Sequence, residues 1–396
     1  MNEDYLRWRH LRWGDLATLE YGKGLRGYQE SISKYPVYGT NGLIGWHDSA
    51  LCKKPGIIIG RKGAYRGVHL SKTPFFVIDT AFYLNLLSDN VDLIWAYYHL
   101  INFDINKIDS GSAIPSTSRE AFYQIPVSLP PLSTQRKIAA ILSAYDDLIE
   151  NNTRRIAILE EMAQSLYREW FVHFRFPGHE KKCMVESALG MIPEGWEVVK
   201  SSDAMEIDPP TKVLKDGEKP FVSMAGLSTA SMLIDTVEMR AGNSGSKFKN
   251  GDTLFARITP CLENGKIGFV QFLPSDQAVA FGSTEFIVLR SNALCPEYVY
   301  LMARSNEFRD NATKSMSGAT GRQRVQIACF DKFLIAHPDS KTLTAFSEQV
   351  EPFFRNIYVL AQKNVNLRRT RDLLLPKLIS GEVDVEGLEV AGVEGR

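Results

Sequence analysis

The chain has 396 residues and a formal net charge of zero, with 44% of residues hydrophobic and 23% charged. This length allows two or three domains of ordinary globular composition, and the overall charge gives no general attraction to nucleic acid. The five cysteines are scattered without a Cys-x-x-Cys pair, which argues against a disulfide framework or a zinc site and favours a cytoplasmic location. We expect no membrane segment, because no apolar run approaches about 18 residues.

Residues 1–131 are predicted to form a first domain of short strands and helices with a local excess of positive charge. Residues 49–78 include six Lys or Arg residues but no Asp or Glu. Such a segment on a neutral chain suits contact with an anionic polymer, although a solvated surface loop is the alternative. The candidate DNA-contacting residues of this domain are Lys23, Asn41, Arg61, Lys62, Arg66, Ser116 and Thr117.

The chemistry of these side chains suits two kinds of contact with DNA. Arginine is the usual bidentate reader of guanine in the major groove. Lysine, hydroxyl and amide groups can hold phosphates or bond to bases. The aromatic residues beside the basic turns, including Trp46 and Tyr65, are interpreted as core residues.

A long helix is predicted over residues 132–178. Residues 132–176 contain no Gly or Pro, and Pro177-Gly178 should end the helix. From Ile138 to Trp170 the apolar positions alternate steps of four and three, which is typical of a seam that faces a partner helix. Glu160 and Glu161 are interpreted as part of the solvated face.

Residues 179–338 are predicted to form a second domain with its own basic segment. Between Asp310 and Asp331 the charged residues are all Lys or Arg. The candidate DNA-contacting residues here are Arg257, Lys266, Thr320, Arg322, Gln323 and Arg324.

A second long helix is predicted over residues 339–385, followed by a flexible tail over 386–396. The seam pattern runs from Phe346 to Leu378, although Pro352 and Pro376 should kink or end the helix. When the two seams are aligned antiparallel and centre to centre, Asn152 faces Asn364. A facing amide pair can fix the register of a coiled coil.

The same alignment places Ala163 against Phe353 and Tyr145 against Arg371. The paired helices would form a rod roughly 50 Å long at about 1.5 Å per residue. A rod of that length would hold two domains more than one turn of B-DNA apart, because a turn is about 34 Å. The geometry suits a reader of two half-sites, or a spacer between two protein-binding modules.

The two halves of the chain repeat one plan. Gly56-Ile-Ile-Ile-Gly-Arg61 resembles Gly251-Asp-Thr-Leu-Phe-Ala-Arg257, since each is a short apolar strand that ends at an arginine. Ala81-Phe-Tyr-Leu84 resembles Glu285-Phe-Ile-Val288, and residues 110–117 resemble residues 317–322. We therefore predict a pseudo-two-fold internal repeat.

The sequence motifs assemble no catalytic centre and no metal site. Asp208-Pro209-Pro210-Thr211 is similar to the Asp-Pro-Pro-Tyr element of amino-methyltransferases, but Thr replaces the aromatic residue and no glycine-rich cofactor loop precedes it. We interpret it as a proline-rich turn. The histidines are dispersed, without a His-Glu-x-x-His motif. We expect neither catalytic residues, nor a bound metal, nor a cofactor.

The helix sequences carry a resemblance to a known family. Leu129-Pro-Pro-Leu-Ser-Thr-Gln-Arg-Lys-Ile-Ala-Ala-Ile-Leu142 with Tyr145-Asp-Asp-Leu-Ile-Glu-Asn151, and Leu367-Arg-Arg-Thr-Arg-Asp-Leu-Leu-Leu-Pro-Lys-Leu-Ile-Ser-Gly-Glu-Val383, resemble the two central regions of type I restriction–modification specificity subunits. The resemblance implies a non-catalytic subunit that binds double-stranded DNA. It also implies two modification (methyltransferase) subunits and restriction/translocase endonuclease subunits as partners.

The predicted fold class is α+β, with two similar α/β target recognition domains separated by two long antiparallel coiled-coil helices. The predicted function is recognition of a bipartite DNA target within a type I complex. Two alternatives stay open at this point. One is a DNA methyltransferase built around Asp208, and the other is a coiled-coil scaffold that is indifferent to DNA.

Overall fold

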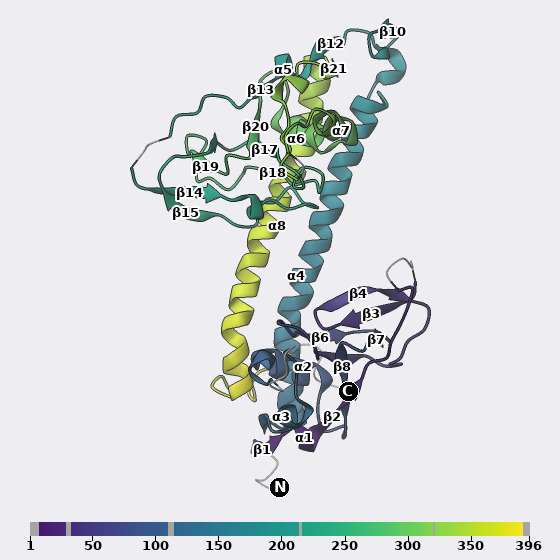
Figure 1. Cartoon of the computed structure of the whole chain (residues 1–396), viewed down its shortest axis with the longest axis vertical. Helices are drawn as coiled ribbons and strands as arrows, with labels where there is room; N and C mark the ends of the chain where they lie inside the picture. The colour runs from purple at the N-terminus through teal and green to yellow at the C-terminus, as the bar shows by residue number, and fades with distance from the viewer. Residues whose placement is uncertain (1–7, 29–32, 110–114, 214–215, 320, 391–396) are drawn as a thin grey trace. The chain divides into compact units, whose positions relative to one another are not determined.

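The computed structural model describes residues 8–28, 33–109, 115–213, 216–319 and 321–390 (Figure 1). The chain divides into two compact units. Unit 1 comprises residues 1–149 and 365–396, and unit 2 comprises residues 150–364. Thr320, one of the predicted DNA-contacting residues, lies outside the described residues.

Unit 1 contains three small sheets and short helices. The first sheet is antiparallel and has the order β2 (Ala17–Tyr21), β8 (Ala81–Leu86), β5 (Gly56–Gly60), β6 (Val68–Ser71). In the second, β3 (Tyr35–Gly39) pairs antiparallel with β4 (Gly42–His47) and parallel with β7 (Phe76–Val77). The third pairs β1 (Arg9–Arg12) with β9 (Pro126–Leu129). The helices are α1 (Trp13–Leu16), α2 (Leu93–Asn102), η2 (Ile105–Lys107) and α3 (Arg119–Tyr123).

The core of unit 1 forms where these sheets and helices meet the first long helix. Ile57, Ile58 and Ile59 are buried, which explains why β5 is apolar at every position between its glycines. Helix α2 begins at a defined cap, because the carboxylate of Asp92 accepts hydrogen bonds from the backbone N–H of Ile94 at 3.0 Å.

Unit 2 has its own sheets and helices. One antiparallel sheet has the order β13 (Met205–Ile207), β20 (Phe286–Ser291), β17 (Thr253–Ala256), β18 (Ile267–Phe269). Another has the order β15 (Glu238–Ala241), β14 (Glu218–Val222), β19 (Ala280–Gly282), β16 (Ser246–Phe248), with β14 and β19 parallel. Two further pairs are β12 (Glu197–Lys200) with β21 (Leu334–His337), and β10 (Met184–Ser187) with β11 (Gly190–Pro193). The helices are η4 (His179–Lys181), α5 (Ser201–Ala204), η5 (Met224–Gly226), α6 (Pro296–Arg304), α7 (Asn306–Lys314) and η6 (Ile327–Cys329).

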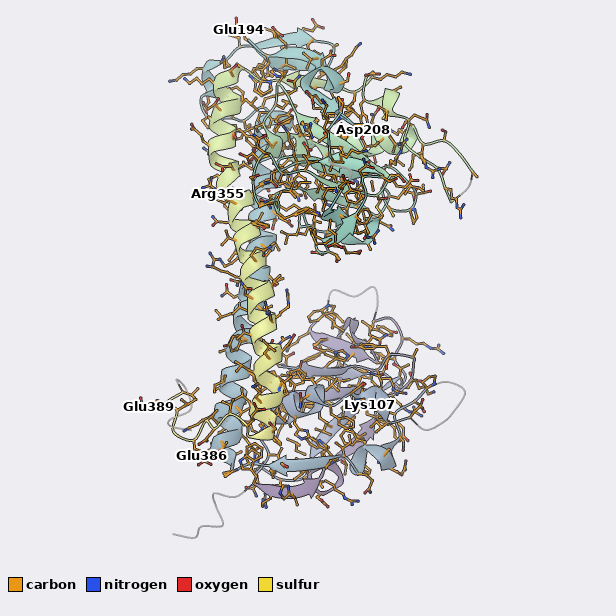
Figure 2. All side chains as sticks on the ribbon, turned by 90° about the vertical axis from the view of Figure 1, so that its left-hand side faces the viewer. Lys107, Glu194, Asp208, Arg355, Glu386 and Glu389 are labelled. Atoms are coloured by element: carbon orange, nitrogen blue, oxygen red, sulfur yellow. The ribbon has the colours of Figure 1, made fainter. Side chains whose placement is uncertain are left out.

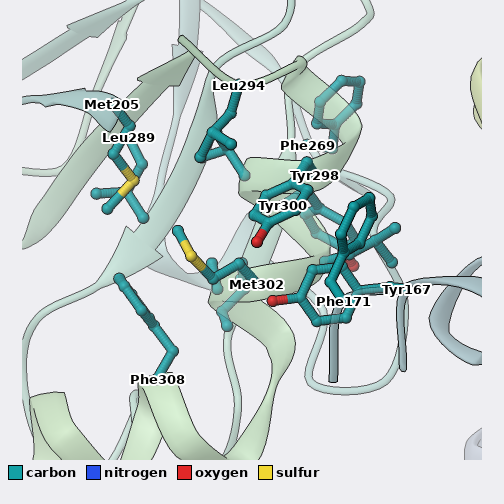
Figure 3. Packing of buried hydrophobic residues seen from close by; sticks show 14 of the residues in the cluster. Tyr167, Phe171, Met205, Phe269, Leu289, Leu294, Tyr298, Tyr300, Met302 and Phe308 are labelled. Carbon is teal, nitrogen blue, oxygen red and sulfur yellow. The ribbon is translucent and has the colours of Figure 1, made fainter. Parts of the chain in front are cut away.

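An aromatic cluster joins the long helices to the core of unit 2 (Figure 3). The ring of Phe171 lies 4.6 Å from that of Tyr298 and 4.7 Å from that of Phe346, measured between centroids. Such edge-on contacts add to the free energy of apolar burial.

The first sheets of the two units share one strand order. The order β2-β8-β5-β6 corresponds to β13-β20-β17-β18, and each unit has a parallel pair in its second sheet. The strand register corrects one sequence match by a residue. Gly60 pairs with Ala81, and Ala256 pairs with Phe286, so Ala81 corresponds to Phe286 rather than to Glu285.

Both long helices are present, with bounds that differ from the prediction. Helix α4 (Leu132–Tyr167) continues as the π-helical segment η3 (Arg168–Val172) and ends before Pro177. The π segment buries both Trp170 and Phe171 in unit 2, and Phe174 then leaves the helix at a φ of 57°. The widened turn, rather than the proline, sets the end of the helix.

Helix α8 (Ser340–Ser380) corrects the expectation for its prolines, because neither Pro352 nor Pro376 ends it. A proline inside a helix removes one backbone donor and costs about 3 kcal/mol. Val350 and Phe354 are buried on either side of Pro352, and their packing in unit 2 offsets that cost.

In unit 2 the helices run antiparallel, and the predicted amide contact is present. The Nδ2 of Asn152 donates to the Oδ1 of Asn364 at 2.9 Å, and Asn364 in turn donates to the hydroxyl of Thr153 at 3.3 Å. Phe354 is more deeply buried than Phe353 and packs against Phe269 and Tyr300 in the core of unit 2, while the pairing of Ala163 with Phe353 stays a prediction.

In unit 1 the facing helix segments meet through a charged contact. Arg371 binds the carboxylate of Asp146, the residue after Tyr145, and Asp146 also accepts a hydrogen bond from the hydroxyl of Tyr98 at 2.6 Å. The segment after Gly381 packs within unit 1 as far as Glu386, and the flexible tail over 386–396 stays a prediction. Val385 is 1% exposed, and Lys137 donates to the carbonyl of Glu386 at 2.6 Å (Figure 2).

Candidate nucleic-acid interface

In unit 1 the predicted residues converge where β5 ends. The N–H of Arg61 donates to the carbonyl of Thr80 at 2.9 Å. The carbonyl of Arg61 accepts from the N–H of Thr117 at 2.9 Å. The N–H of Gly63 donates to the carbonyl of Pro115 at 3.0 Å. Three segments that are distant in sequence are thus held side by side.

The same set of hydrogen bonds occurs in unit 2 where β17 ends. The N–H of Arg257 donates to the carbonyl of Glu285 at 3.0 Å, and its carbonyl accepts from Val325 at 2.9 Å. Thr259 donates to the carbonyl of Gln323 at 3.1 Å. We call these two places the strand-end sites. They comprise residues 61–63, 80 and 115–117 in unit 1, and residues 257–259, 285 and 323–325 in unit 2.

The strand-end site of unit 1 is rich in unpaired positive charge. The guanidinium carbon of Arg61 lies 4.7 Å from the centre of the Tyr21 ring, and that of Arg119 lies 5.2 Å from the same ring. Lys62 is exposed beside them. Among the residues that the structure describes, no carboxylate forms an ion pair with Arg61, Lys62 or Arg119.

The strand-end site of unit 2 carries a compensating carboxylate. Arg324 binds Glu285 through two nitrogens, with the closest pair of atoms 2.6 Å apart. This contact, with a smaller contribution from Arg257, holds the pKa of Glu285 below its ordinary value. Glu285 therefore stays ionised at neutral pH and offsets part of the local positive charge.

Three predicted contact residues serve the fold instead. Arg66 is 2% exposed and donates to the carbonyl of Asn106 at 3.0 Å. Thr117 is 4% exposed and donates to the carbonyl of Gly60 at 2.8 Å. Lys266 donates to the carbonyl of Met224 at 2.9 Å. Sequence pattern could not detect these contacts, because each joins segments far apart in the chain.

The other predicted DNA-contacting residues differ in how exposed they are. Lys23, Asn41, Lys62 and Arg322 are exposed, and Ser116 and Gln323 are half-buried. Asn41 lies in the turn between β3 and β4, which also contains Thr40, whose carbonyl accepts a hydrogen bond from the N–H of Gly67 at 3.0 Å beside the end of β5. Tyr65 is 67% exposed and Trp46 is also exposed, which corrects their interpretation as core residues.

Tyr21, Arg119 and Glu285 were not predicted as site residues. Tyr21 and Arg119 belong to no basic run or motif, Glu285 entered only as the first residue of a repeated strand, and each acquires its role from a neighbour in the fold. Glu160 was also misread, because its carboxylate accepts hydrogen bonds from the Ser231 hydroxyl and the Met232 N–H, both at 2.7 Å. Burial raises the pKa of Glu160.

Asp208-Pro209-Pro210 borders a hollow of about 550 Å³ that Lys212 and Lys247 also line. The carboxylate of Asp208 accepts a hydrogen bond from the N–H of Val288 at 2.8 Å, and its φ of 48° places it in a tight turn. The carboxylate thus fastens the turn to β20, which agrees with the interpretation as a proline-rich turn.

Metal-binding clusters and membrane-spanning helices are both absent from the described part of the chain. Within it, no group of three or more His, Cys, Asp or Glu residues is arranged to hold a metal ion. No helix in that part combines the length and apolarity needed to cross a membrane.

Residues 6–161 match the family described as the type I restriction modification DNA specificity domain. The MjaIX specificity subunit of Methanocaldococcus jannaschii is 25% identical over 295 residues, which cover 72% of this chain and 66% of the relative. The EcoEI specificity subunit of Escherichia coli is 32% identical over 154 residues, which cover 37% of this chain and 26% of the relative. The chain thus spans just under two thirds of the first relative's length.

A crystal structure of the S subunit of a type I restriction–modification system from M. genitalium shows the same fold. The comparison covers 96% of this chain and 97% of that chain, with a TM-score of 0.60 and 16% sequence identity. Together with the relatives and the helix motifs over residues 129–151 and 367–383, these findings show that the chain is similar to type I restriction–modification specificity subunits and that residues 6–161 match the DNA specificity domain of that family.

Proposed function

We propose that this chain selects the DNA sequence on which a type I restriction–modification complex acts. Each unit would contribute one recognition surface around its strand-end site, so the target would consist of two parts. The observation that carries this proposal is the repetition of one hydrogen-bonded site in both units, with Arg61 and Arg257 at the same position. The two units would form a pseudo-two-fold internal repeat.

The proposed mechanism separates affinity from sequence selection. Exposed cations such as Lys62 and Arg322 would hold phosphates, which makes the affinity depend on salt concentration. Side chains at the strand-end sites would select bases through hydrogen bonds in the grooves. The chain would supply no catalytic group, and the modification partners would carry out methylation.

The long helices would serve as an antiparallel coiled-coil spacer and as the docking surface for partner subunits. Both helices carry exposed apolar side chains, namely Leu148, Ile158, Met162, Val359, Val365 and Leu373. Exposed apolar residues on a helix are suited to a partner helix or groove. We propose that two modification subunits bind there, with restriction/translocase subunits joining the assembly.

The proposal can be tested by mapping methylated sites in a genome that carries the complete system. We expect a motif of two specified parts separated by unspecified bases. Exchange of residues 179–338 for those of a relative should change one part and leave the other intact. A continuous motif, or a change in both parts, would contradict the assignment of one part to each unit.

A further inference from the structure

We propose that Tyr21, Arg61 and Arg119 form a clamp for a DNA backbone phosphate in unit 1. This inference rests on the proposed DNA-binding function, and it assigns a binding role to Tyr21 and Arg119. The three side chains come from the end of β2, the residue after β5 and the start of α3.

The clamp is built around one aromatic ring. The guanidinium carbons of Arg61 and Arg119 lie 4.7 Å and 5.2 Å from the centre of the Tyr21 ring. Arg119 also donates to the hydroxyl of Tyr123 at 3.2 Å, and Arg61 donates to the carbonyl of Asp79 at 3.1 Å. These contacts hold both guanidinium groups in place before a ligand binds, which lowers the entropic cost of binding.

The electrostatics of the clamp call for an anion. Two guanidinium groups that share one ring repel each other, and an anion bound to both would relieve that repulsion. The carboxylates nearest in sequence have other contacts, because Glu120 accepts from the hydroxyl of Ser118 at 3.1 Å and Glu20 accepts from Thr18 at 3.0 Å. Each guanidinium has five N–H donors, so donors remain for a ligand.

A phosphate suits these donors better than a base edge does. A phosphate oxygen pair accepts the two parallel N–H groups of a guanidinium, and two arginines can share one phosphate. Phosphate contacts also set the position of a protein on DNA without carrying sequence information. The clamp adjoins Lys62 of the strand-end site, so a phosphate bound here would place the neighbouring bases beside that site.

Unit 2 lacks this arrangement. Thr117 of unit 1 and Val325 of unit 2 make the same hydrogen bond in their strand-end sites. Arg119 lies two residues after Thr117, so its counterpart in unit 2 is Ile327, two residues after Val325. The clamp is therefore specific to unit 1.

The test is DNA binding by the full chain assembled with its modification subunits, measured over a series of salt concentrations. Arg119→Gln should lower the slope of log affinity against log salt by about 0.9, the value for one phosphate contact. We expect the affinity to fall roughly tenfold on duplexes with and without the target sequence. Tyr21→Leu should have a similar effect, because it removes the ring that orders both arginines.

Arg175→Gln is the matched control, because Arg175 forms a bidentate contact with Glu169 on an exposed segment of unit 2. It should leave the slope unchanged, and thermal unfolding should show that each variant is folded. Unchanged slopes for Arg119→Gln and Tyr21→Leu would overturn the clamp. A loss restricted to the target duplex would also overturn it, because Arg119 would then read a base. If the unaltered complex did not bind DNA, the proposed function would fail instead.

Discussion

The two strand-end sites have the same backbone and different charge. In unit 1 Arg61 lies against Tyr21 without a carboxylate partner among the described residues. In unit 2 the corresponding Arg257 lies near Glu285, which binds Arg324. Apolar strands and backbone hydrogen bonds determine the backbone structure of both strand-end sites, so the side chains at the ends of the strands can differ between the units. A repeated framework with different edges is what the proposed recognition of two unlike half-sites would require.

The two units also differ in the pKa shifts of their buried ionisable groups. In unit 1 the indole N–H of Trp13 donates to the Nδ1 of His99 at 3.3 Å, and burial lowers the pKa of His99 to about 4. In unit 2 burial raises the pKa of both Glu160 and Glu297. As the pH falls, the lowered pKa in unit 1 reduces the stability of the folded state, whereas the raised pKa values in unit 2 increase it.

The largest predicted effect is a loss of stability of unit 1 in acid. The neutral form of His99 is favoured in the folded state, so its contribution is complete above pH 6.5 and is lost as the pH falls from 6.5 toward 4. The loss should approach about 3 kcal/mol, and His99→Gln should remove this pH dependence. Amide hydrogen exchange, corrected for its intrinsic pH dependence, reports each unit separately.

Unit 2 supplies the control for this experiment. Glu160 and Glu297 have raised pKa values, so protonation favours the folded state and their contribution to stability grows as the pH falls. The protection of unit 1 should therefore fall more than that of unit 2. Equal loss in both units, or an unchanged pH response in His99→Gln, would refute the assignment to His99.

The next effect concerns the polar contacts between the long helices. Unit 2 uses the amide pair of Asn152 and Asn364, whereas unit 1 uses the charged contact of Asp146 and Arg371. Asn152→Leu should destabilise unit 2 by about 1–3 kcal/mol, because it removes the donor that Asn152 supplies to the buried Oδ1 of Asn364. Adding Asn364→Leu should recover most of that loss, as measured by denaturant unfolding. If the double variant were as unstable as the single one or more so, the pair would not act as a unit.

Much of the framework could be predicted from the sequence. The seam periodicity located both helices and brought Asn152 to Asn364, since it depends on local spacing. The apolar strands before Arg61 and Arg257 were equally visible. The expectation that Pro352 would end the helix was wrong, because the packing of Val350 and Phe354 outweighs the cost of a proline inside a helix.

The site could be predicted less well, because charge pairing is a tertiary property. Arg66 and Arg61 look alike in a basic segment, yet Asn106 and Asp109 hold the first inside the fold. Glu285 lies outside both basic segments, and its contact with Arg324 appears when the chain folds. A count of basic residues therefore overestimated the positive charge available in unit 2.

The smallest predicted effect tests the charge comparison directly, through an exchange between corresponding positions. Thr80 and Glu285 each accept the backbone N–H of the shared arginine, so Glu285→Thr gives unit 2 the charge pattern of unit 1. Release of Arg324 and Arg257 should strengthen DNA binding on the order of threefold to tenfold at low salt and steepen the salt dependence. Thr80→Glu should do the reverse by placing a carboxylate beside Arg61. Binding measured at two salt concentrations distinguishes these outcomes. If both variants weakened binding, Glu285 would be a contact residue that accepts a hydrogen bond from a base, and its role as a counter-charge would be wrong.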